Sequence, residues 1–236
     1  MSQSSKGHLT GNRILDRLPL GESDRLLPLA ESVSLRHLEQ LHEQDGPLPH
    51  VYFPKSGVLS AVIALGEGRV VEAATIGNEG MVGIPALLDL DFTTAAVTSQ
   101  VPGESLRIPT PSFVQAMKQC GPLDILLRRY IAFSLRSAYQ AVACHALHSA
   151  EERMSRWLLT TQDRVGKREF SLTQEFLAEM LGVRRQTVQV VAGTLQTAGL
   201  ITYRRGLIRV IDREGLEAAS CECYEITKAL YDRIVQ

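Results

Sequence analysis

The sequence predicts an α+β fold in three parts: a β-rich domain over residues 1–119, a long helix and hinge over 120–149, and a winged helix-turn-helix domain over 150–236. Three observations support this prediction. Short β-prone runs separated by Gly and Pro fill the first half of the chain. A helical pattern of about thirty residues follows Gly121-Pro122. Two further helical patterns, joined by Gly182, precede a predicted β-hairpin.

Five runs predict the strands of the first domain. They are HVYFP (50–54), GVLSAVIALG (57–66), RVVEAATIG (69–77), AAVTSQVPG (95–103) and SLRIPTP (105–111). Short strands with turn residues at regular spacing are typical of a small sandwich or barrel. The segment at 14–42 is expected to be helical and to lead into this β region.

The composition is that of an ordinary globular protein, with 44% hydrophobic residues and a net charge of −1. No secretory signal is recognisable, and no apolar run reaches the roughly 20 residues needed to cross a bilayer. The protein is therefore expected to be cytoplasmic. The cysteines form no C-x-x-C pair, so reduced thiols are expected at Cys120, Cys144, Cys221 and Cys223.

The segment SLTQEFLAEMLGVRRQTVQVVAG (171–193) predicts two helices joined by a tight turn. Thr173 can cap the first helix, which should cover 174–181, and Gly182 can supply the positive φ at its end. The second helix is expected from about Arg184. Apolar residues occupy the positions that a three-helix core requires: Leu177, Leu181, Val183, Val188 and Val191. This is the helix-turn-helix arrangement.

Polar side chains at the start and on the outer face of the second helix predict base contacts. They are Arg184, Arg185, Gln186 and Gln189. Arg can bind guanine O6 and N7 with two hydrogen bonds, and Gln can bind adenine N6 and N7 in the same way. Thr173 and Thr187 are expected at the DNA backbone. Taken alone, the pattern also fits a solvated helix face or a protein-interaction surface.

The following segment, GLITYRRGLIRVIDREGL (199–216), favours DNA binding because it predicts a strand, a turn, a second strand and a short helix. Such a hairpin forms a wing, and Arg204 and Arg205 at its tip are suited to phosphate contacts. Residues 151–213 contain eleven Lys or Arg and seven Asp or Glu, a local balance of +4. This is an electrostatic signature of DNA binding. Double-stranded DNA is therefore the expected partner. No catalytic motif is present, so an enzyme is not expected.

The long helix is expected to form the seam of a homodimer, because DNA-binding proteins usually pair on two half-sites of a near-palindrome. The proposed seam follows a period of about 3.5–3.6 residues and consists of Leu123, Leu127, Tyr130, Ser134 and Ala141. A core helix of a single chain is the alternative. A second helix should follow over 151–165.

These features together resemble the CRP/FNR superfamily of bacterial transcription regulators over nearly the whole chain. The resemblance is carried by IGNEGMVG (76–83), HSAEERMSRWLL (148–159) and the stretch from Leu172 to Asp212. It implies a cyclic-nucleotide-binding-like β-roll, a dimerisation helix and a winged helix-turn-helix, with RNA polymerase as a further partner. Arg185 and Gln186 fall where such regulators carry an Arg and a Glu that read bases. Val190 replaces a further Arg of the cyclic-AMP-responsive members, so a different operator is expected.

The resemblance also implies an effector pocket in the β-roll, with Gly77, Glu79, Gly80, Thr93 and Thr94 as candidate residues. Cyclic-nucleotide binders use an Arg followed by Ser or Thr against the cyclic phosphate. The equivalent residues here, DFTTAA (91–96), contain no basic side chain. We therefore expect allosteric control by an effector other than cyclic AMP. A constitutive regulator with a ligand-free β-roll is the alternative.

Two segments carry residues that could bind a metal or respond to oxidants. Cys144, His145 and His148 lie close together on the long helix, but no fourth ligand is identifiable there. Cys221 and Cys223 lie near the C-terminus. Packing roles are expected for both segments, with no metal or other cofactor, and a redox-responsive regulator is kept as an alternative. No cysteine precedes Cys120, so the N-terminal iron–sulfur cluster of some members of the superfamily is not expected, and no haem ligand set is evident.

Overall fold

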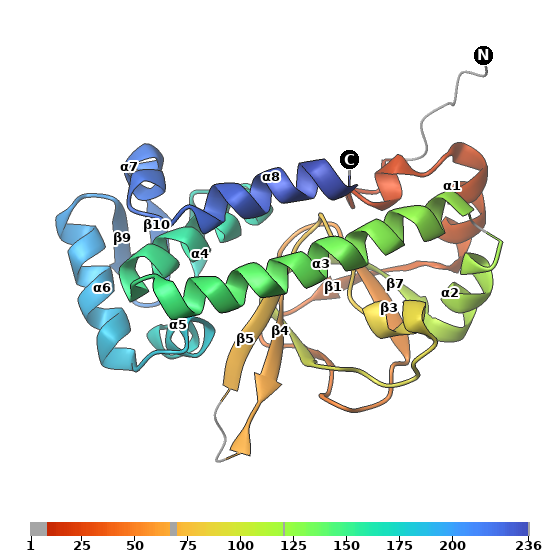
Figure 1. The fold of residues 1–236 in the computed structure, drawn as a ribbon, viewed down its shortest axis with the longest axis horizontal. Coiled ribbons are helices and arrows are strands. Elements are labelled where there is room, and N and C mark those ends of the chain that lie inside the picture. Colours follow the sequence, from red (N-terminus) through yellow and green to blue (C-terminus); the bar gives the residue numbers. More distant parts are fainter. Residues whose placement is uncertain (1–8, 67–69, 120, 236) are drawn as a thin grey trace. The chain divides into compact units, whose positions relative to one another are not determined.

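The computed structural model describes residues 9–66, 70–119 and 121–235. Contacts divide the chain into two compact units. One contains the residues up to 61, residues 75–134 and Val235, and the other contains residues 62–74 and 135–234. Strands dominate the first unit, whereas the second is mainly helical with a small sheet (Figure 1).

Two sheets are built from the five expected strands and from β1 and β2, which the sequence does not predict. One has the order β1-β7-β3 and the other the order β2-β6-β4-β5. The strands are β1 (Glu31–Leu35), β2 (Gln40–His42), β3 (His50–Pro54), β4 (Val58–Ala64), β5 (Val70–Ile76), β6 (Ala96–Val101) and β7 (Gly103–Pro109). The five β-prone runs of the sequence are thus confirmed as β3 to β7.

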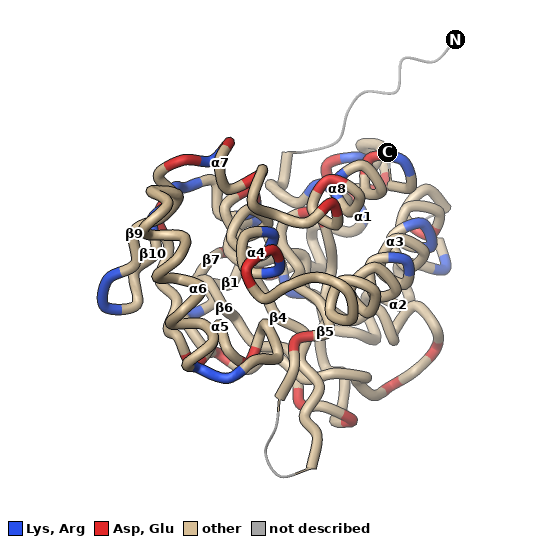
Figure 2. Tube along the Cα trace, turned by 60° about the vertical axis from the view of Figure 1, so that its left-hand side comes forward, with Lys and Arg blue, Asp and Glu red and all other residues tan. Residues whose placement is uncertain are grey.

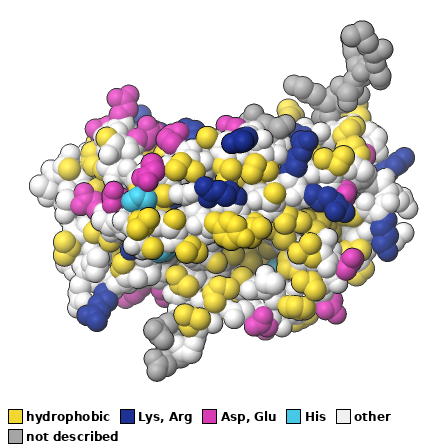
Figure 3. Space-filling model, in the orientation of Figure 1, with side chains coloured by type: hydrophobic (Ala, Val, Ile, Leu, Met, Phe, Trp, Pro, Cys, Tyr) yellow, Lys and Arg dark blue, Asp and Glu magenta, His cyan; other side chains and the backbone are white. Residues whose placement is uncertain are grey.

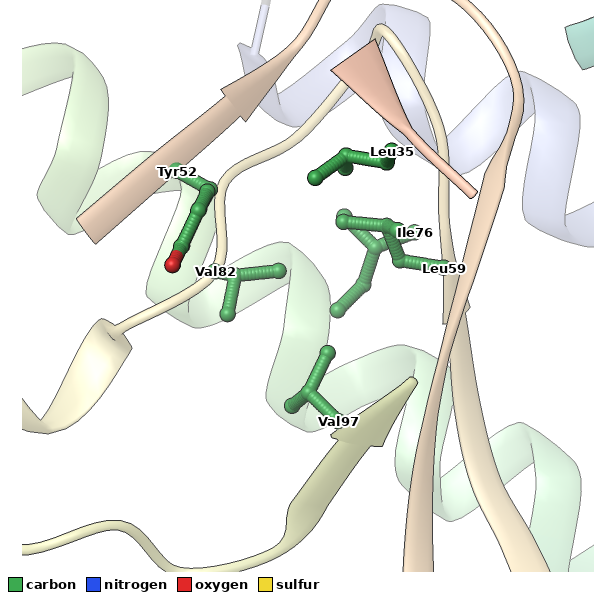
Figure 4. Close-up of a cluster of buried hydrophobic side chains, with 6 residues drawn as sticks. All are labelled: Leu35, Tyr52, Leu59, Ile76, Val82 and Val97. Carbon is green, nitrogen blue, oxygen red and sulfur yellow. The ribbon is translucent and has the colours of Figure 1, made fainter. Parts of the chain in front are cut away.

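A cluster of apolar side chains forms part of the core between these strands (Figure 4). It comprises Leu35, Tyr52, Leu59, Ile76, Val82 and Val97. The first four and Val97 come from five different strands, and Val82 comes from the loop after β5. Burying such a side chain contributes about 1.5–3 kcal/mol. The cluster therefore holds both sheets together.

The helical expectation for residues 14–42 is correct only at its start. A short 3-10 turn η1 (Leu15–Arg17), helix α1 (Leu20–Leu26) and a second turn η2 (Leu27–Leu29) occupy this part. From Glu31 onward the chain is extended, because β1 pairs with β7 in the register Val33↔Ser105. Long-range pairing thus overrides the local pattern. Two further elements, η4 (Ile84–Leu88) and α2 (Thr110–Met117), complete this region.

Helix α3 (Gly121–Leu147) is 27 residues long, close to the length that the sequence predicts. It is followed by α4 (Ala150–Val165), whose start is fixed by a capping box. The Ser149 hydroxyl accepts from the Glu152 N–H, and the Glu152 carboxylate accepts from the Ser149 N–H. The turn between α3 and α4 is therefore only a few residues long.

The rest of the second unit is a winged helix-turn-helix followed by a C-terminal helix. Its elements are β8 (Glu169–Ser171), α5 (Gln174–Leu181), α6 (Arg185–Thr197), β9 (Ile201–Arg204), β10 (Leu207–Val210), α7 (Arg213–Ala218) and α8 (Cys223–Val235). The wing is a three-stranded sheet in the order β8-β10-β9. The sequence predicts every one of these elements except β8 and α8. Among the described residues, no helix is long and apolar enough to cross a membrane.

Candidate nucleic-acid interface and effector cavity

The turn between α5 and α6 is fixed by local hydrogen bonds. The Thr173 hydroxyl accepts from the Phe176 N–H at 3.2 Å and so caps α5. Gly182 ends the helix with φ of 60°, and its N–H donates to the Glu179 carbonyl. Thr173 keeps its hydroxyl hydrogen available for a phosphate. The turn therefore sets the direction in which α6 leaves the core.

Helix α6 presents the predicted base-reading residues to solvent. Arg184, Arg185, Gln186 and Gln189 are all exposed, and Thr187 is partly buried. The opposite side of the helix is buried through Val188, Val191, Ala192 and Leu195. Val190 is 69% exposed beside the polar residues. An exposed apolar side chain here is suited to contact with a thymine methyl group.

An ion pair that sequence reasoning missed holds Arg185. Its Nη1 lies 2.8 Å from Oε1 of Glu175 on α5, and both side chains are more than 60% exposed (63% and 68%). Such exposed pairs contribute only about 0.2–1 kcal/mol. The pair therefore orients Arg185 without fixing it, and the guanidinium can leave Glu175 at little cost.

A groove of about 590 Å³ runs between the start of α5, the outer face of α6 and the wing. Tyr203 lies in its wall. The Tyr203 hydroxyl donates to the Leu172 carbonyl at 2.8 Å. The backbone N–H of Tyr203 donates to Oε1 of Gln196, also at 2.8 Å. Burial raises the pKa of Tyr203 to about 12. The phenol therefore stays protonated and ties β9 to the segment before α5, while the Tyr203 N–H ties β9 to α6.

The wing tip is a two-residue turn made of Arg205 and Gly206, with φ of 50° and 77°. Arg204 pairs with Leu207 across it. Positive φ at both central residues defines the type I′ hairpin turn, which matches the twist of the strands. Figure 2 shows Lys and Arg at this tip and at the turn before α6. In the described part of the chain, no ion pair engages Arg184, Arg204 or Arg205.

Some of the basic residues counted in the sequence have structural roles instead. Arg153 is 8% exposed and donates from Nη1 to the Leu181 carbonyl at 2.8 Å, which links α4 to the end of α5. Arg213 lies 2.8 Å from the Asp163 carboxylate. Arg209 lies 2.6 Å from that of Glu169. Of the counted basic residues, those that stay exposed without such a role lie at the α5–α6 turn, at the wing tip and, as Lys167 and Arg168, before β8.

The first unit contains a small, mostly apolar cavity of about 100 Å³. Of the five predicted effector residues, Thr93 and Thr94 line it, and no Lys or Arg does so among the described residues. The Thr93 hydroxyl donates to the Glu43 carbonyl, and its N–H donates to the Gly46 carbonyl at 2.9 Å. Thr93 is therefore already used to hold the loop before β3.

The other three predicted effector residues lie in a turn outside the cavity lining. The Gly77 N–H donates to Oε1 of Glu79 at 3.1 Å. The Gly80 N–H donates to the Gly77 carbonyl, and the Gly80 carbonyl accepts from Nδ2 of Asn12 at 2.9 Å. Their polar groups thus stabilise the turn itself.

The predicted dimer seam lies largely inside the chain. Leu123, Leu127 and Tyr130 are at most 3% exposed. Ser134 and Ala141 are partly buried. These residues face the chain's own core, and α3 carries a second apolar stripe on its exposed side. Leu135, Tyr139 and Val142 on that stripe are 52%, 61% and 70% exposed. Figure 3 shows hydrophobic side chains on the face along which α3 runs.

The two cysteine segments, separate in the sequence, come together in the second unit. Cys144, His148, Cys221 and Cys223 place their possible ligand atoms within 4.8 Å of one another. No local spacing could have signalled this, because 77 residues separate Cys144 from Cys221. Cys120 lies outside the described residues.

Comparison with known proteins identifies two domains in this chain. A model of the cyclic nucleotide-binding domain matches residues 33–120, and a model of the Crp-like helix-turn-helix domain matches residues 152–219. Electron transport regulator A of Shewanella oneidensis is 23% identical over 188 residues, covering 75% of this chain and 74% of the relative.

Solved structures agree with this fold. A protein of Eubacterium rectale assigned to the CRP/FNR family of transcriptional regulators superposes with a TM-score of 0.68 at 18% identity, covering 89% of this chain and 98% of its own. FixK2 of Bradyrhizobium japonicum gives 0.66 at 19% identity, with 81% and 98% covered. The predicted α+β architecture is therefore confirmed.

Proposed function

Because the chain is a CRP/FNR-type DNA-binding transcription regulator, we propose that it binds a near-palindromic duplex site as a homodimer, with α6 in the major groove and the wing on the backbone. The observation that supports this most directly is the exposed set Arg184, Arg185, Gln186 and Gln189. Two of these residues, Arg185 and Gln189, line a groove that Arg205 also lines. Arg and Gln at these positions can read base edges. Thr173, Thr187, Arg204 and Arg205 bind phosphates and set the register.

The homodimer forms through the exposed stripe of α3. Leu135, Tyr139 and Val142 have the four-then-three spacing of a helical seam that packs against a copy of itself. Contiguous apolar side chains in solvent are a recognised sign of an interaction surface. Two recognition helices would then lie about 34 Å apart, one turn of DNA. RNA polymerase is the further partner that a transcription regulator of this type requires.

Control of DNA binding passes through the first unit, and cyclic AMP is not its effector. The cavity is small and mostly apolar, and Thr93, one of its polar residues, is occupied by hydrogen bonds to backbone carbonyls. A small neutral or apolar molecule fits this lining. The small cavity is equally compatible with the alternative, a constitutive regulator whose β-roll binds no ligand and acts only as a scaffold.

Selection of bound fragments from random duplexes, followed by fluorescence anisotropy, tests the proposal. We expect an enriched motif with two-fold symmetry and half-sites separated by one DNA turn. Light scattering of the complex should give two chains per duplex. A protein that enriches no motif at moderate salt, or that binds as a monomer, would contradict the proposal.

A redox-responsive regulator is the second candidate, and the gathering of three buried cysteines favours it. Anisotropy measured with reduced and oxidised protein distinguishes the two. Unchanged affinity after oxidation would exclude the redox candidate and leave the main proposal intact.

A further inference from the structure

We propose that Cys144, His148, Cys221 and Cys223 form a closed tetrahedral site for one structural zinc ion. Cys144 lies in the last turn of α3 and His148 directly after that helix, whereas Cys221 lies two residues before α8 and Cys223 is its first residue. This proposal does not depend on how the protein reads DNA, because the four residues lie apart from the groove that contains Arg185.

The side chains have the donor set and spacing of such a site. Zinc with about 2.3 Å to sulfur and about 2.0–2.1 Å to nitrogen requires neighbouring ligand atoms roughly 3.5–3.8 Å apart. Sγ of Cys144 lies 3.6 Å from Sγ of Cys221, and Sγ of Cys223 lies 3.6 Å from Nδ1 of His148. All four ligand atoms lie within 4.8 Å of one another. Only small adjustments are needed to surround an ion.

The backbone brings the four ligands together by two local devices. Cys144 and His148 are four residues apart, and the His148 N–H donates to the Cys144 carbonyl at 3.1 Å, so both point from one side of the helix. Cys221 and Cys223 lie two residues apart where the chain turns into α8. The matched helix-turn-helix segment ends at residue 219, so this second pair lies just beyond it.

The surrounding groups complete the site. Nε2 of His148 lies 3.1 Å from the Glu222 carboxylate, which leaves Nδ1 directed at Cys223. A carboxylate on the second imidazole nitrogen is the usual support of a metal-binding His. Nε2 of Gln140 donates to Sγ of Cys223 at 3.0 Å, and Oε1 of Gln140 accepts from Nη1 of Arg136 at 2.9 Å. A sulfur that accepts an amide N–H can carry the negative charge of a ligand.

Burial determines the kind of site. Cys144, Cys221 and Cys223 are at most 3% exposed, and the side chain of His148 is 14% exposed. Four protein ligands leave no open position for a substrate, which is the pattern of structural zinc sites. Three thiolates and one imidazole favour zinc over magnesium or calcium. The ion would tie the start of α8 to the end of α3.

Metal content of the full-length protein tests the proposal. Protein purified under reducing conditions without chelator should contain one zinc per chain by elemental mass spectrometry. After removal of the metal, titration with Co²⁺ should give a thiolate-to-cobalt charge-transfer band and the visible bands of a tetrahedral ion, saturating at one Co²⁺ per chain. Zn²⁺ should then displace the cobalt and abolish both.

Variants identify the ligands. Cys144→Ser and Cys223→Ser should each lose the zinc, whereas Cys120→Ser, at the only cysteine outside the set, should retain it. His148→Cys should retain one metal ion with a stronger charge-transfer band, because a fourth thiolate replaces the imidazole.

The proposal fails if reduced wild-type protein binds neither Zn²⁺ nor Co²⁺. It also fails if the Ser variants retain full zinc, or if the native protein has lost two hydrogens to a Cys144–Cys221 disulfide and its reduced form takes up no metal. Should a Ser variant not fold, the cobalt titration of the wild type still decides. DNA binding is not a readout here, so failure of this site and failure of the proposed function remain distinguishable.

Discussion

In the proposed DNA complex, Glu175 would compete with DNA for the guanidinium of Arg185. The two groups lie 2.8 Å apart on the surface proposed to face the duplex, where the carboxylate would approach the phosphates. Glu175→Gln should therefore tighten binding to all duplexes, by up to about fivefold, the equivalent of the about 1 kcal/mol that an exposed ion pair is worth. Glu179→Gln, an exposed acid on the same helix, is the control and should change affinity less. Weaker specific binding by Glu175→Gln would show instead that Glu175 holds Arg185 for base reading.

Arg185 itself is expected to read a base. Arg185→Ala should cost about 1–3 kcal/mol at the preferred site and relax the preference at one base pair. The physical reason is the loss of two hydrogen bonds to one guanine edge. Anisotropy with a set of single-substitution duplexes measures it. Equal loss on preferred and random duplexes would rule out a base-reading role.

Arg205 should bind phosphate without reading sequence. Its φ of 50° is strained for Arg but is accessible to Asn. Arg205→Asn therefore removes the charge without straining the turn further, so the melting temperature should not fall. Binding to every duplex should weaken alike, and the slope of log affinity against log salt should flatten by about 1. A change in base preference would assign Arg205 to reading instead.

At the scale of elements, helix α3 shows what periodicity could and could not predict. The helix and its length follow from the sequence, but the period also predicts a dimer seam at Leu123, Leu127 and Tyr130, which are buried in the chain's own core. An amphipathic pattern identifies an apolar face and not its partner. The exposed stripe at Leu135, Tyr139 and Val142 is interrupted by small and polar residues, so it was the weaker signal.

The exposed stripe of α3 gives the dimer a direct test. Val142→Asp should place a charge in the seam and raise the dimer dissociation constant, because burying an unpaired charge is costly. Leu147→Asp is a matched control, since Leu147 is 79% exposed on a different side of the same helix and should leave the dimer intact. Sedimentation equilibrium measures both. Dimers of equal strength in the two variants would place the seam elsewhere.

At the scale of the whole molecule, the elements that local interactions specify could be predicted from the sequence, whereas features that depend on residues distant in the sequence could not. The helix-turn-helix and wing are specified by local signals such as the Thr173 cap and Gly182. Strand β1 depends on pairing with β7, some seventy residues away, so its local pattern was misleading. The four-residue cluster around Cys144 likewise depends on residues that are 77 positions apart. In the sequence the pair Cys144 and His148 lies far from the pair Cys221 and Cys223, so sequence analysis predicts no metal site.

If the first unit controls DNA binding as proposed, its cavity limits which effector the regulator can respond to. Its volume of about 100 Å³ is below the roughly 300–1,000 Å³ of typical ligand sites. A cyclic phosphate is a full negative charge, and burying it without a partner costs several kcal/mol. No Lys or Arg is among the described residues that line the cavity.

Cyclic AMP and cyclic GMP should therefore bind no more tightly than millimolar and should not alter DNA affinity. Calorimetry with each nucleotide, and anisotropy with the selected duplex, measure this. Micromolar binding that also strengthens the DNA complex would mean that the cavity opens and acquires a cation such as Arg107 from elsewhere in the same unit.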